Sequence, residues 1–156
     1  MSMHQPKNYP ALSDFSAILC EDVRDEKNGK HTLIGVFSSN TITIQKSDDA
    51  STAQLPSMAI FMRISNVEEG EYEMSISLTS PSEKNAFEGI APKKVTAKKK
   101  PHQKKTTLVS VVKLAGFFLE EGNYKFFFKL DEHQYEYTFD AVFLDKPIPQ
   151  EDASTA

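Results

Sequence analysis

Residues 122–143 read GNYKFFFKLDEHQYEYTFDAVF, two runs of alternating apolar and polar side chains joined by the polar connection DEHQ. Successive side chains of an extended chain point to opposite faces, so each run predicts a β-strand with one buried and one solvated face. The connection, Asp131 to Gln134, predicts a four-residue hairpin loop. We therefore expect an antiparallel hairpin whose inward-facing side chains are Tyr124, Phe126, Phe128, Leu130, Tyr135, Tyr137, Phe139, Ala141 and Phe143.

The same period of two recurs at residues 70–79, whose predicted inward-facing side chains are Tyr72, Met74, Ile76 and Leu78. Other runs rich in β-branched and aromatic residues, which are typical of strands, lie at 33–37, 41–44, 58–64 and 107–114. Turn signals recur at roughly the 8–12-residue spacing of a sandwich or barrel. The predicted fold class is all-β, an antiparallel β-sandwich of about eight or nine strands with near-immunoglobulin-like topology.

One segment, residues 14–27, fits two kinds of secondary structure. Its apolar residues recur at three- and four-residue steps, and Ser13 and Gly29 stand where a helix would begin and end. The segment also fits a strand that leads into a turn at Asn28 and Gly29, because Asn-Gly supplies the two positive-φ residues of a type I′ hairpin. Periodicity leaves both interpretations open.

The pattern EEGxY occurs twice, at residues 68–72 and 120–124, each time just before an alternating strand. In immunoglobulin-like sandwiches, a Tyr at a corner between the two sheets hydrogen-bonds backward to the backbone. Tyr72 and Tyr124 both fit such a corner. The alternative is a pair of ordinary turns in which Gly allows the reversal and Tyr faces the core.

The chain has 156 residues and a mass of 17.5 kDa, which suits one domain. Both ends are polar and contain prolines. We expect an N-terminal tail over residues 1–12, one sandwich domain over 13–146 with a lysine-rich loop at 92–106, and a C-terminal tail over 147–156.

Composition bears on whether the protein has disulfides or a membrane span and on its compartment. The single cysteine excludes an internal disulfide framework and a multi-cysteine metal site. No apolar run approaches the ~20 residues of a membrane-spanning helix, and the first residues lack the pattern of a signal peptide. With a net charge of −4, these features predict a soluble, cytoplasmic protein without a membrane span.

Four segments follow one another in a characteristic order: AILCEDVRDEKNGKHTLIGVF (17–37), LPSMAIFMRI (55–64), EEGEYEMSISL (68–78) and FFLEEGNYKFFFKLDEHQYEYTF (117–139). Their order and spacing are similar to those of a family of uncharacterised bacterial proteins, a domain of unknown function. The resemblance covers about residues 15–143. It implies an all-β sandwich and a strand for the first segment, but no activity. The lysine-rich segment is longer and more basic than the family pattern, and the two tails lie outside it.

No catalytic or metal-binding pattern stands out. The four histidines, at positions 4, 31, 102 and 133, lack the close spacing of metal-ligand pairs. Cys20 precedes two acids, whose charges disfavour the thiolate, so an inert thiol is expected. A calcium site would need several acids to converge from different loops, whereas acidic pairs at strand ends also fit solvated turns. The pairs are Glu21/Asp22, Asp25/Glu26, Asp48/Asp49, Glu68/Glu69, Glu120/Glu121 and Asp131/Glu132.

The strongest compositional feature is PKKVTAKKKPHQKK, residues 92–105, which holds seven lysines and no acid. The rest of the chain then carries 11 basic and 22 acidic residues. Three interpretations stay open. The segment fits a solvated connector whose lysines oppose edge pairing, or an arm that binds a polyanion or an acidic protein. It also fits a loop that folds back over the acidic remainder of the chain. The run has no arginine or aromatic residue, so nucleic-acid binding there would be weak. The candidate contact residues are Lys93, Lys94, Lys98, Lys99, Lys100, Lys104 and Lys105.

The predicted function is a non-catalytic binding or structural module that acts through contacts with another protein and uses no cofactor. Phe127 breaks the alternation and would face outward, where it is covered by the chain or belongs to a protein interface. Two alternatives stay open. One is an enzyme or a calcium-type, metal-dependent domain with a site assembled from dispersed acidic and His residues. The other is weak polyanion binding through the lysine-rich loop.

Overall fold

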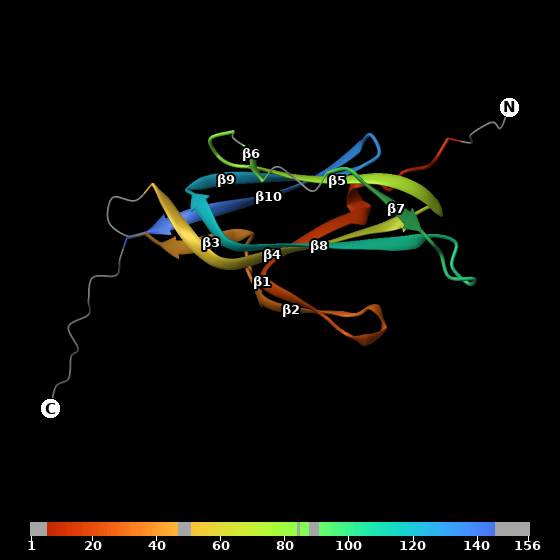
Figure 1. Cartoon of the computed structure of the whole chain (residues 1–156), viewed down its shortest axis with the longest axis horizontal. Coiled ribbons are helices and arrows are strands. Elements are labelled where there is room, and N and C mark those ends of the chain that lie inside the picture. Colours follow the sequence, from red (N-terminus) through yellow and green to blue (C-terminus); the bar gives the residue numbers. More distant parts are fainter. Residues whose placement is uncertain (1–5, 47–50, 84, 88–90, 146–156) are drawn as a thin grey trace.

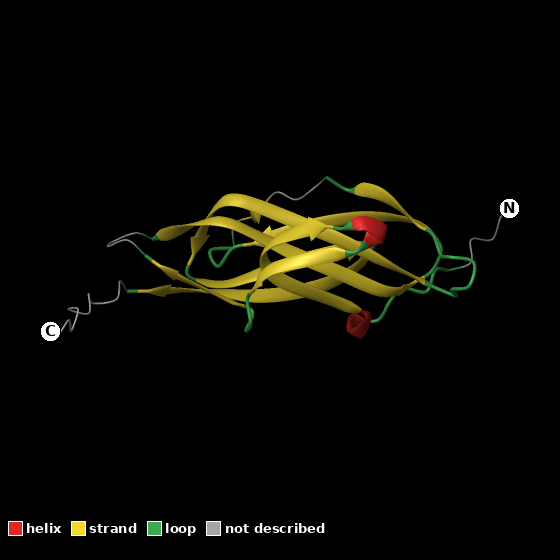
Figure 2. Ribbon diagram, turned by 90° about the horizontal axis from the view of Figure 1, so that it is seen from below, coloured by secondary structure: helices red, strands yellow, loops and turns green. Residues whose placement is uncertain are grey.

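The computed structural model describes residues 6–46, 51–83, 85–87 and 91–145, which form two layers of strands packed face to face (Figure 1). The strands of one layer cross those of the other at an angle (Figure 2). The strands are β1 (Phe15–Asp25), β2 (His31–Val36), β3 (Thr41–Gln45), β4 (Thr52–Val67), β5 (Gly70–Thr79), β6 (Asn85–Phe87), β7 (Lys93–Ala97), β8 (Thr106–Glu120), β9 (Gly122–Leu130) and β10 (His133–Leu144).

The strand order confirms the predicted sandwich. Sheet A has the order β2-β1-β4-β8, and sheet B has the order β3-β10-β9-β5-β6, with β7 also paired to β5. The series β1-β4-β8 and β5-β9-β10 follow the order of strands A-B-E and C-F-G in immunoglobulin domains. Between β5 and β8 the described chain adds β6 and β7 along the edge of β5.

The β9–β10 hairpin forms the centre of the core, as predicted. Its ladder joins Tyr124 to Phe139 and Phe128 to Tyr135, and all four side chains are buried. Because residues opposite each other in a ladder share a face, these aromatic rings form one apolar surface, which packs against Met58, Ile60, Met62 and Ile64 of β4. Of the predicted inward-facing residues, Met74, Tyr137 and Phe143 are only partly buried, and the first two pack against this core.

The β9–β10 loop is shorter than predicted. His133 pairs with Leu130, so only two residues, Asp131 and Glu132, lie outside the ladder. Asp131 takes a positive φ of 52°, a conformation that Asp tolerates and that allows a tight reversal.

The antiparallel prediction fails at one pair, because β3 runs parallel to β10. A hairpin can join only antiparallel neighbours, whereas the chain here passes from sheet A to sheet B between β2 and β3. The strand β3 therefore joins the sheet beside the last strand rather than beside its own neighbour in sequence.

The segment that fitted both a helix and a strand is a strand. A short 3-10 turn, Leu12–Asp14, leads into β1, and Asn28 and Gly29 adopt the predicted positive φ values, 65° and 69°. They belong to a second 3-10 turn, Lys27–Gly29, and not to a two-residue type I′ turn, because Asp25 pairs with His31 and the loop between them is longer. The first half of β1 pairs with β4 and its second half pairs with β2, so the β1–β2 hairpin leaves the sandwich (Figure 1). It covers the outer face of sheet A through a second small core of Cys20, Val23 and Ala59, against which Leu33, Phe61 and Val111 pack.

Both EEGxY motifs lie where the chain crosses between sheets, from β4 to β5 and from β8 to β9. The Tyr72 hydroxyl donates a hydrogen bond to the Glu68 carbonyl, and the Tyr124 hydroxyl accepts one from the Glu120 N–H, each at 2.8 Å. Both tyrosines therefore make the backward bond of a tyrosine corner, and Tyr124 sits at the corner that corresponds to E–F in immunoglobulin domains.

Two predicted boundaries differ from the structure. Lys93–Ala97, predicted to belong to the lysine-rich loop, forms β7, because its alternate residues Val95 and Ala97 face the core. Residues 7–10, predicted to belong to a tail, pack against β5 and β10 through hydrogen bonds and stacked rings. The predicted C-terminal tail lies outside the described residues. No helical segment of the described chain is long and apolar enough to cross a membrane.

Candidate functional site

An apolar slot opens between β7 of sheet B and β8 of sheet A, and we call it the β7–β8 slot. In the described part of the chain, β8 pairs only with β4 and β7 pairs only with β5. Both strands are therefore sheet edges, and an edge strand presents a row of unpaired backbone N–H and C=O groups. Two edges thus face each other where the sandwich is open.

The slot reaches the core between the sheets and has a volume of about 290 Å³. Its floor is formed by Phe15, Met62 and Phe128. All four consecutive residues 108–111 line it, so the backbone of β8 forms one wall. Val95 of β7 and Met74 of β5 form the opposite wall. A group that entered the slot would meet apolar side chains and one strand edge.

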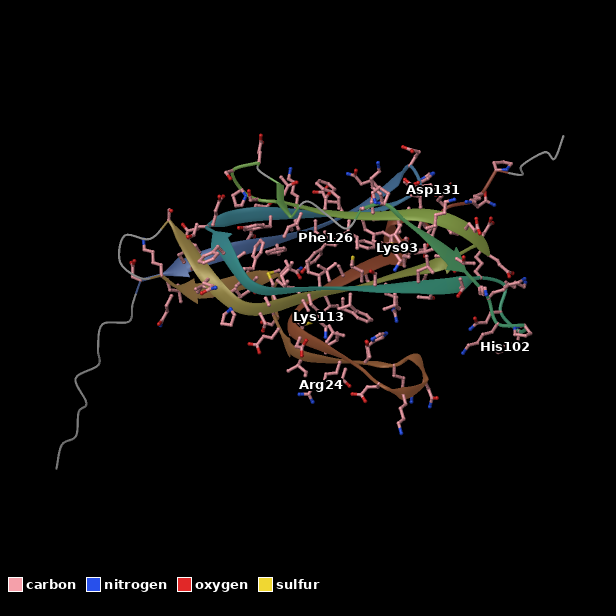
Figure 3. The ribbon with its side chains drawn as sticks, viewed as in Figure 1. Arg24, Lys93, His102, Lys113, Phe126 and Asp131 are labelled. Carbon is pink, nitrogen blue, oxygen red and sulfur yellow. The ribbon has the colours of Figure 1, made fainter. Side chains whose placement is uncertain are left out.

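Lys93 is the charged residue among the described residues that line the slot. It pairs with Met74 across β5 and β7, as Val95 pairs with the buried Tyr72. Since opposite residues share a face, Lys93 stands on the inward face of β7, and its label in Figure 3 lies between the two layers. Its side chain is exposed, and no described acceptor pairs with its ammonium group. Among the described residues, a lysine without an ion-pair partner therefore stands at the mouth of an apolar slot.

The other predicted lysines do not gather at one point. Lys94 alternates with Lys93 and so faces outward on β7. The remaining five lie in the connection from β7 to β8, at the end of the sandwich marked by His102 in Figure 3. A turn closed by the Gln103 N–H and the Lys100 carbonyl, 2.9 Å apart, shapes this connection. All five are exposed: Lys98, Lys99, Lys100, Lys104 and Lys105.

The edge strand β8 also carries exposed apolar side chains. Val109 is 42% exposed and Phe118 is 62% exposed, whereas Phe117 packs against the core. Phe127, which was predicted to face outward on its strand, lies on β9 and is half-buried. Val109, which borders the slot, and Phe118, toward the far end of the strand, are thus separate exposed apolar residues, with the exposed Lys113 between them.

A polar cluster around Asp131 holds the N-terminal segment. The Asp131 carboxylate accepts hydrogen bonds from the Glu73 N–H at 2.8 Å and the Tyr9 hydroxyl at 2.6 Å, and pairs with Lys7 at 3.3 Å. Burial alone would raise the pKa of this carboxyl, but these three donors outweigh it and lower the pKa. The same hydrogen bond, with burial, raises the pKa of Tyr9 to about 12. The ring of Tyr9 also stacks on His133 with centroids 3.7 Å apart, so the cluster anchors residues 7–10.

The remaining candidate residues are dispersed. Cys20 is fully buried, and burial, followed by the charge of Asp22, raises the pKa of its thiol. His31 pairs with Asp25 at 3.0 Å on the β1–β2 hairpin, and His4 lies outside the described residues. Within the described ranges, no three His, Cys, Asp or Glu side chains gather in a group that could hold a metal ion.

The acidic pairs serve separate local contacts. Glu68 accepts hydrogen bonds from Asn8, Glu120 from Ser82, and Glu121 from the Phe143 N–H. Asp22 pairs with Lys113 at 3.3 Å, which ties the β1–β2 hairpin to β8. Asp48 and Asp49 lie outside the described residues.

The slot itself was missed by the sequence analysis. The signal was present in KVTA, residues 94–97, where Val95 and Ala97 alternate with polar neighbours. The surrounding lysines dominate the composition of the segment, so it was predicted to be a loop, and the short period of two was not recognised as a strand. A cavity between two edges also depends on which strands pair, and that information is not local.

The fold and the open edge define an all-β sandwich domain. A model of a family of unknown function (DUF6941) matches residues 16–139. The chain therefore belongs to this family, and the match covers most of the sandwich, from β1 into β10. A search of curated proteins finds no match to the chain.

Proposed function

We propose that this protein is a non-catalytic recognition module that binds an extended segment of a partner protein in the β7–β8 slot. The observation that carries the proposal is the unpaired edge of β8 beside an apolar slot. An extended peptide can add to such an edge through its backbone, and its alternate side chains then enter the pocket beside the edge.

The size of the slot favours a peptide side chain over a free small molecule. A volume of about 290 Å³ is at the lower limit of small-molecule sites, which usually occupy roughly 300–1,000 Å³. The wall made by residues 108–111 is backbone as well as side chain, and it offers the hydrogen bonds that a strand can use. The exposed side chains of Val109 and Phe118 supply further apolar contact along the same strand.

A random peptide library displayed on phage and selected on the immobilised protein tests the proposal. Ser110 faces the slot from β8, and Ser110→Trp would fill it, with Ser110→Leu as a milder change if the tryptophan variant does not fold. The matched control is Thr138→Trp, because Thr138 is exposed on β10, in the other sheet.

We expect the wild type and the control to enrich peptides with apolar residues at alternate positions. We expect the variants at Ser110 to enrich none, with circular dichroism confirming that they are folded. Enrichment that is equal on all forms would contradict the proposal. So would a wild-type dimer that the change at Ser110 dissociates, because the slot would then bind a second copy of the chain.

A further inference from the structure

We infer that the segment bound in the β7–β8 slot carries a carboxylate next to its apolar anchor, and that Lys93 binds this carboxylate. The inference rests on the proposed function and specifies the chemistry of the partner: an extended acidic peptide with an apolar side chain that enters the slot. A neutral apolar peptide would satisfy the proposed function but not this inference.

The position of Lys93 is the first argument. The ladder between β5 and β7 places it on the same face as Val95, toward the slot rather than toward solvent on the outer face. In the described structure no carboxylate pairs with its ammonium group. A strand added to β8 would remove water from the mouth of the slot. An ammonium group that loses part of its water without gaining a partner is destabilised, so a strand that supplies an acceptor there should bind better than one that does not.

The surrounding charge is the second argument. Five further lysines follow β7 and precede β8, so they flank the end of the slot away from Lys93. Lys113, farther along β8, is already paired with Asp22. The rest of the chain is acidic, with 11 basic and 22 acidic residues once the seven lysines are set aside. An acidic peptide is therefore attracted to this end of the molecule and repelled elsewhere, which favours one docking place.

An edge strand with an inward-pointing charge also resists unwanted pairing, which is a general protection of sheet edges. This protection and the inferred recognition use the same group. A partner strand that lacks an acid would leave the ammonium group unpaired and bind poorly, whereas a strand with a correctly placed acid would bind. Lys93 would thus allow strands that carry a correctly placed acid to bind at the edge, and would disfavour other strands.

The test uses three synthetic peptides and four forms of the full chain. The peptides share an alternating Val-Thr sequence and carry Glu, Gln or Lys at both flanks. The protein forms are wild type, Lys93→Gln, Lys93→Arg and the control Lys125→Gln, which removes an equal charge from an exposed position on β9. Calorimetry or fluorescence anisotropy gives the affinities at two salt concentrations.

We expect the Glu peptide to bind wild type most tightly and the Lys peptide least. Lys93→Gln should weaken binding of the Glu peptide about 2- to 5-fold and binding of the Gln peptide less than about twofold, which is the range for an exposed charge pair. Lys93→Arg should restore most of the affinity, Lys125→Gln should have little effect, and added salt should reduce the difference between the peptides.

The outcomes separate the two proposals. If wild type binds the Glu and Gln peptides equally, and Ser110→Trp abolishes this binding, the inferred role of Lys93 is wrong. The proposed function would then still hold. Binding of the Glu peptide that the change at Ser110 does not affect would contradict both. Absence of binding by all three peptides, together with absence of enrichment from the random library, would likewise contradict both.

Discussion

Tyr72 and Tyr124 occupy equivalent corners of the sandwich but use their hydroxyl groups in opposite ways. Tyr72 donates to the Glu68 carbonyl and Tyr124 accepts from the Glu120 N–H, in each case across four residues at 2.8 Å. Each bond satisfies a backbone group where the chain leaves one sheet for the other and ladder pairing is interrupted. The repeated EEGxY motif is thus one structural device, used at the crossings from sheet A into β5 and β9 of sheet B.

Removal of either hydroxyl should destabilise the protein without changing the fold. Tyr124→Phe leaves the Glu120 N–H without its partner, and Tyr72→Phe leaves the Glu68 carbonyl without one. The loss of a partner for a buried polar group costs roughly 1–3 kcal/mol, and both rings are almost fully buried. Urea unfolding of the two variants measures the free energy directly. A loss below about 0.3 kcal/mol in both would show that water replaces the hydroxyl and that the corners are ordinary turns.

Gly35 should resist substitution because of its backbone and its neighbour. Its φ is 63°, and a Cβ there would lie 2.6 Å from the Glu21 carboxylate. We expect Gly35→Ala to cost about 1–3 kcal/mol through the left-handed conformation and this clash. Combining it with Glu21→Ala should recover the part due to the clash and leave about 1 kcal/mol from the backbone. Thermal unfolding of the four forms completes this cycle, and strictly additive effects would contradict the predicted contact.

The Asp131 cluster should make stability depend on pH in the acid range. The folded protein holds the pKa of Asp131 below its ordinary value of 3.8, so the carboxylate contributes stability fully above the unfolded pKa. That contribution is lost as the pH falls through the lower folded pKa. In Asp131→Asn, the decline of stability below about pH 4 should therefore be shallower than in wild type. Unfolding measured between about pH 2 and 7 checks this, and parallel profiles would refute it.

Any binding of polyanions should run through the connection between β7 and β8. We expect weak binding of labelled DNA, RNA or anionic vesicles at low salt, falling by up to about 0.9 log units per log unit of salt for each phosphate contacted. Changing Lys98, Lys99, Lys100, Lys104 and Lys105 to Ser should abolish it. Equal binding by the two forms would place the contact elsewhere, and absence of binding by wild type would leave these lysines to their role beside the slot.

The sequence predicted those parts of the fold that depend on local alternation. The period of two in residues 70–79 and 122–143 identifies the strands and the face that each buries, because side-chain direction in an extended chain is a local property. The positive φ values of Asn28 and Gly29 were also predicted, because they depend on residue type and not on tertiary pairing. The tyrosine corners were predicted as one of two alternatives, because a Tyr in an ordinary turn gives the same sequence.

Features that depend on tertiary pairing were not predicted. The parallel contact between β3 and β10, the cover of sheet A by the β1–β2 hairpin, and the docking of Tyr9 onto Asp131 all join segments distant in sequence. The slot belongs to this class as well, since it exists only because β7 adds to sheet B while β8 ends sheet A. Among the seven predicted lysines, only the register of β7 distinguishes Lys93 from Lys94.

Hydrogen exchange of the backbone amides, with and without a bound Glu-flanked peptide, tests the central claim most directly. If the peptide adds to the edge of β8, amides across Thr106–Glu120 should gain protection, with a smaller gain in β7, and Ser110→Trp should remove both effects. Exchange in β2 and β3, the opposite edges of the two sheets, should not change. Protection confined to β2 or β3, or peptide binding with unchanged exchange in β8, would contradict recognition at the β7–β8 slot.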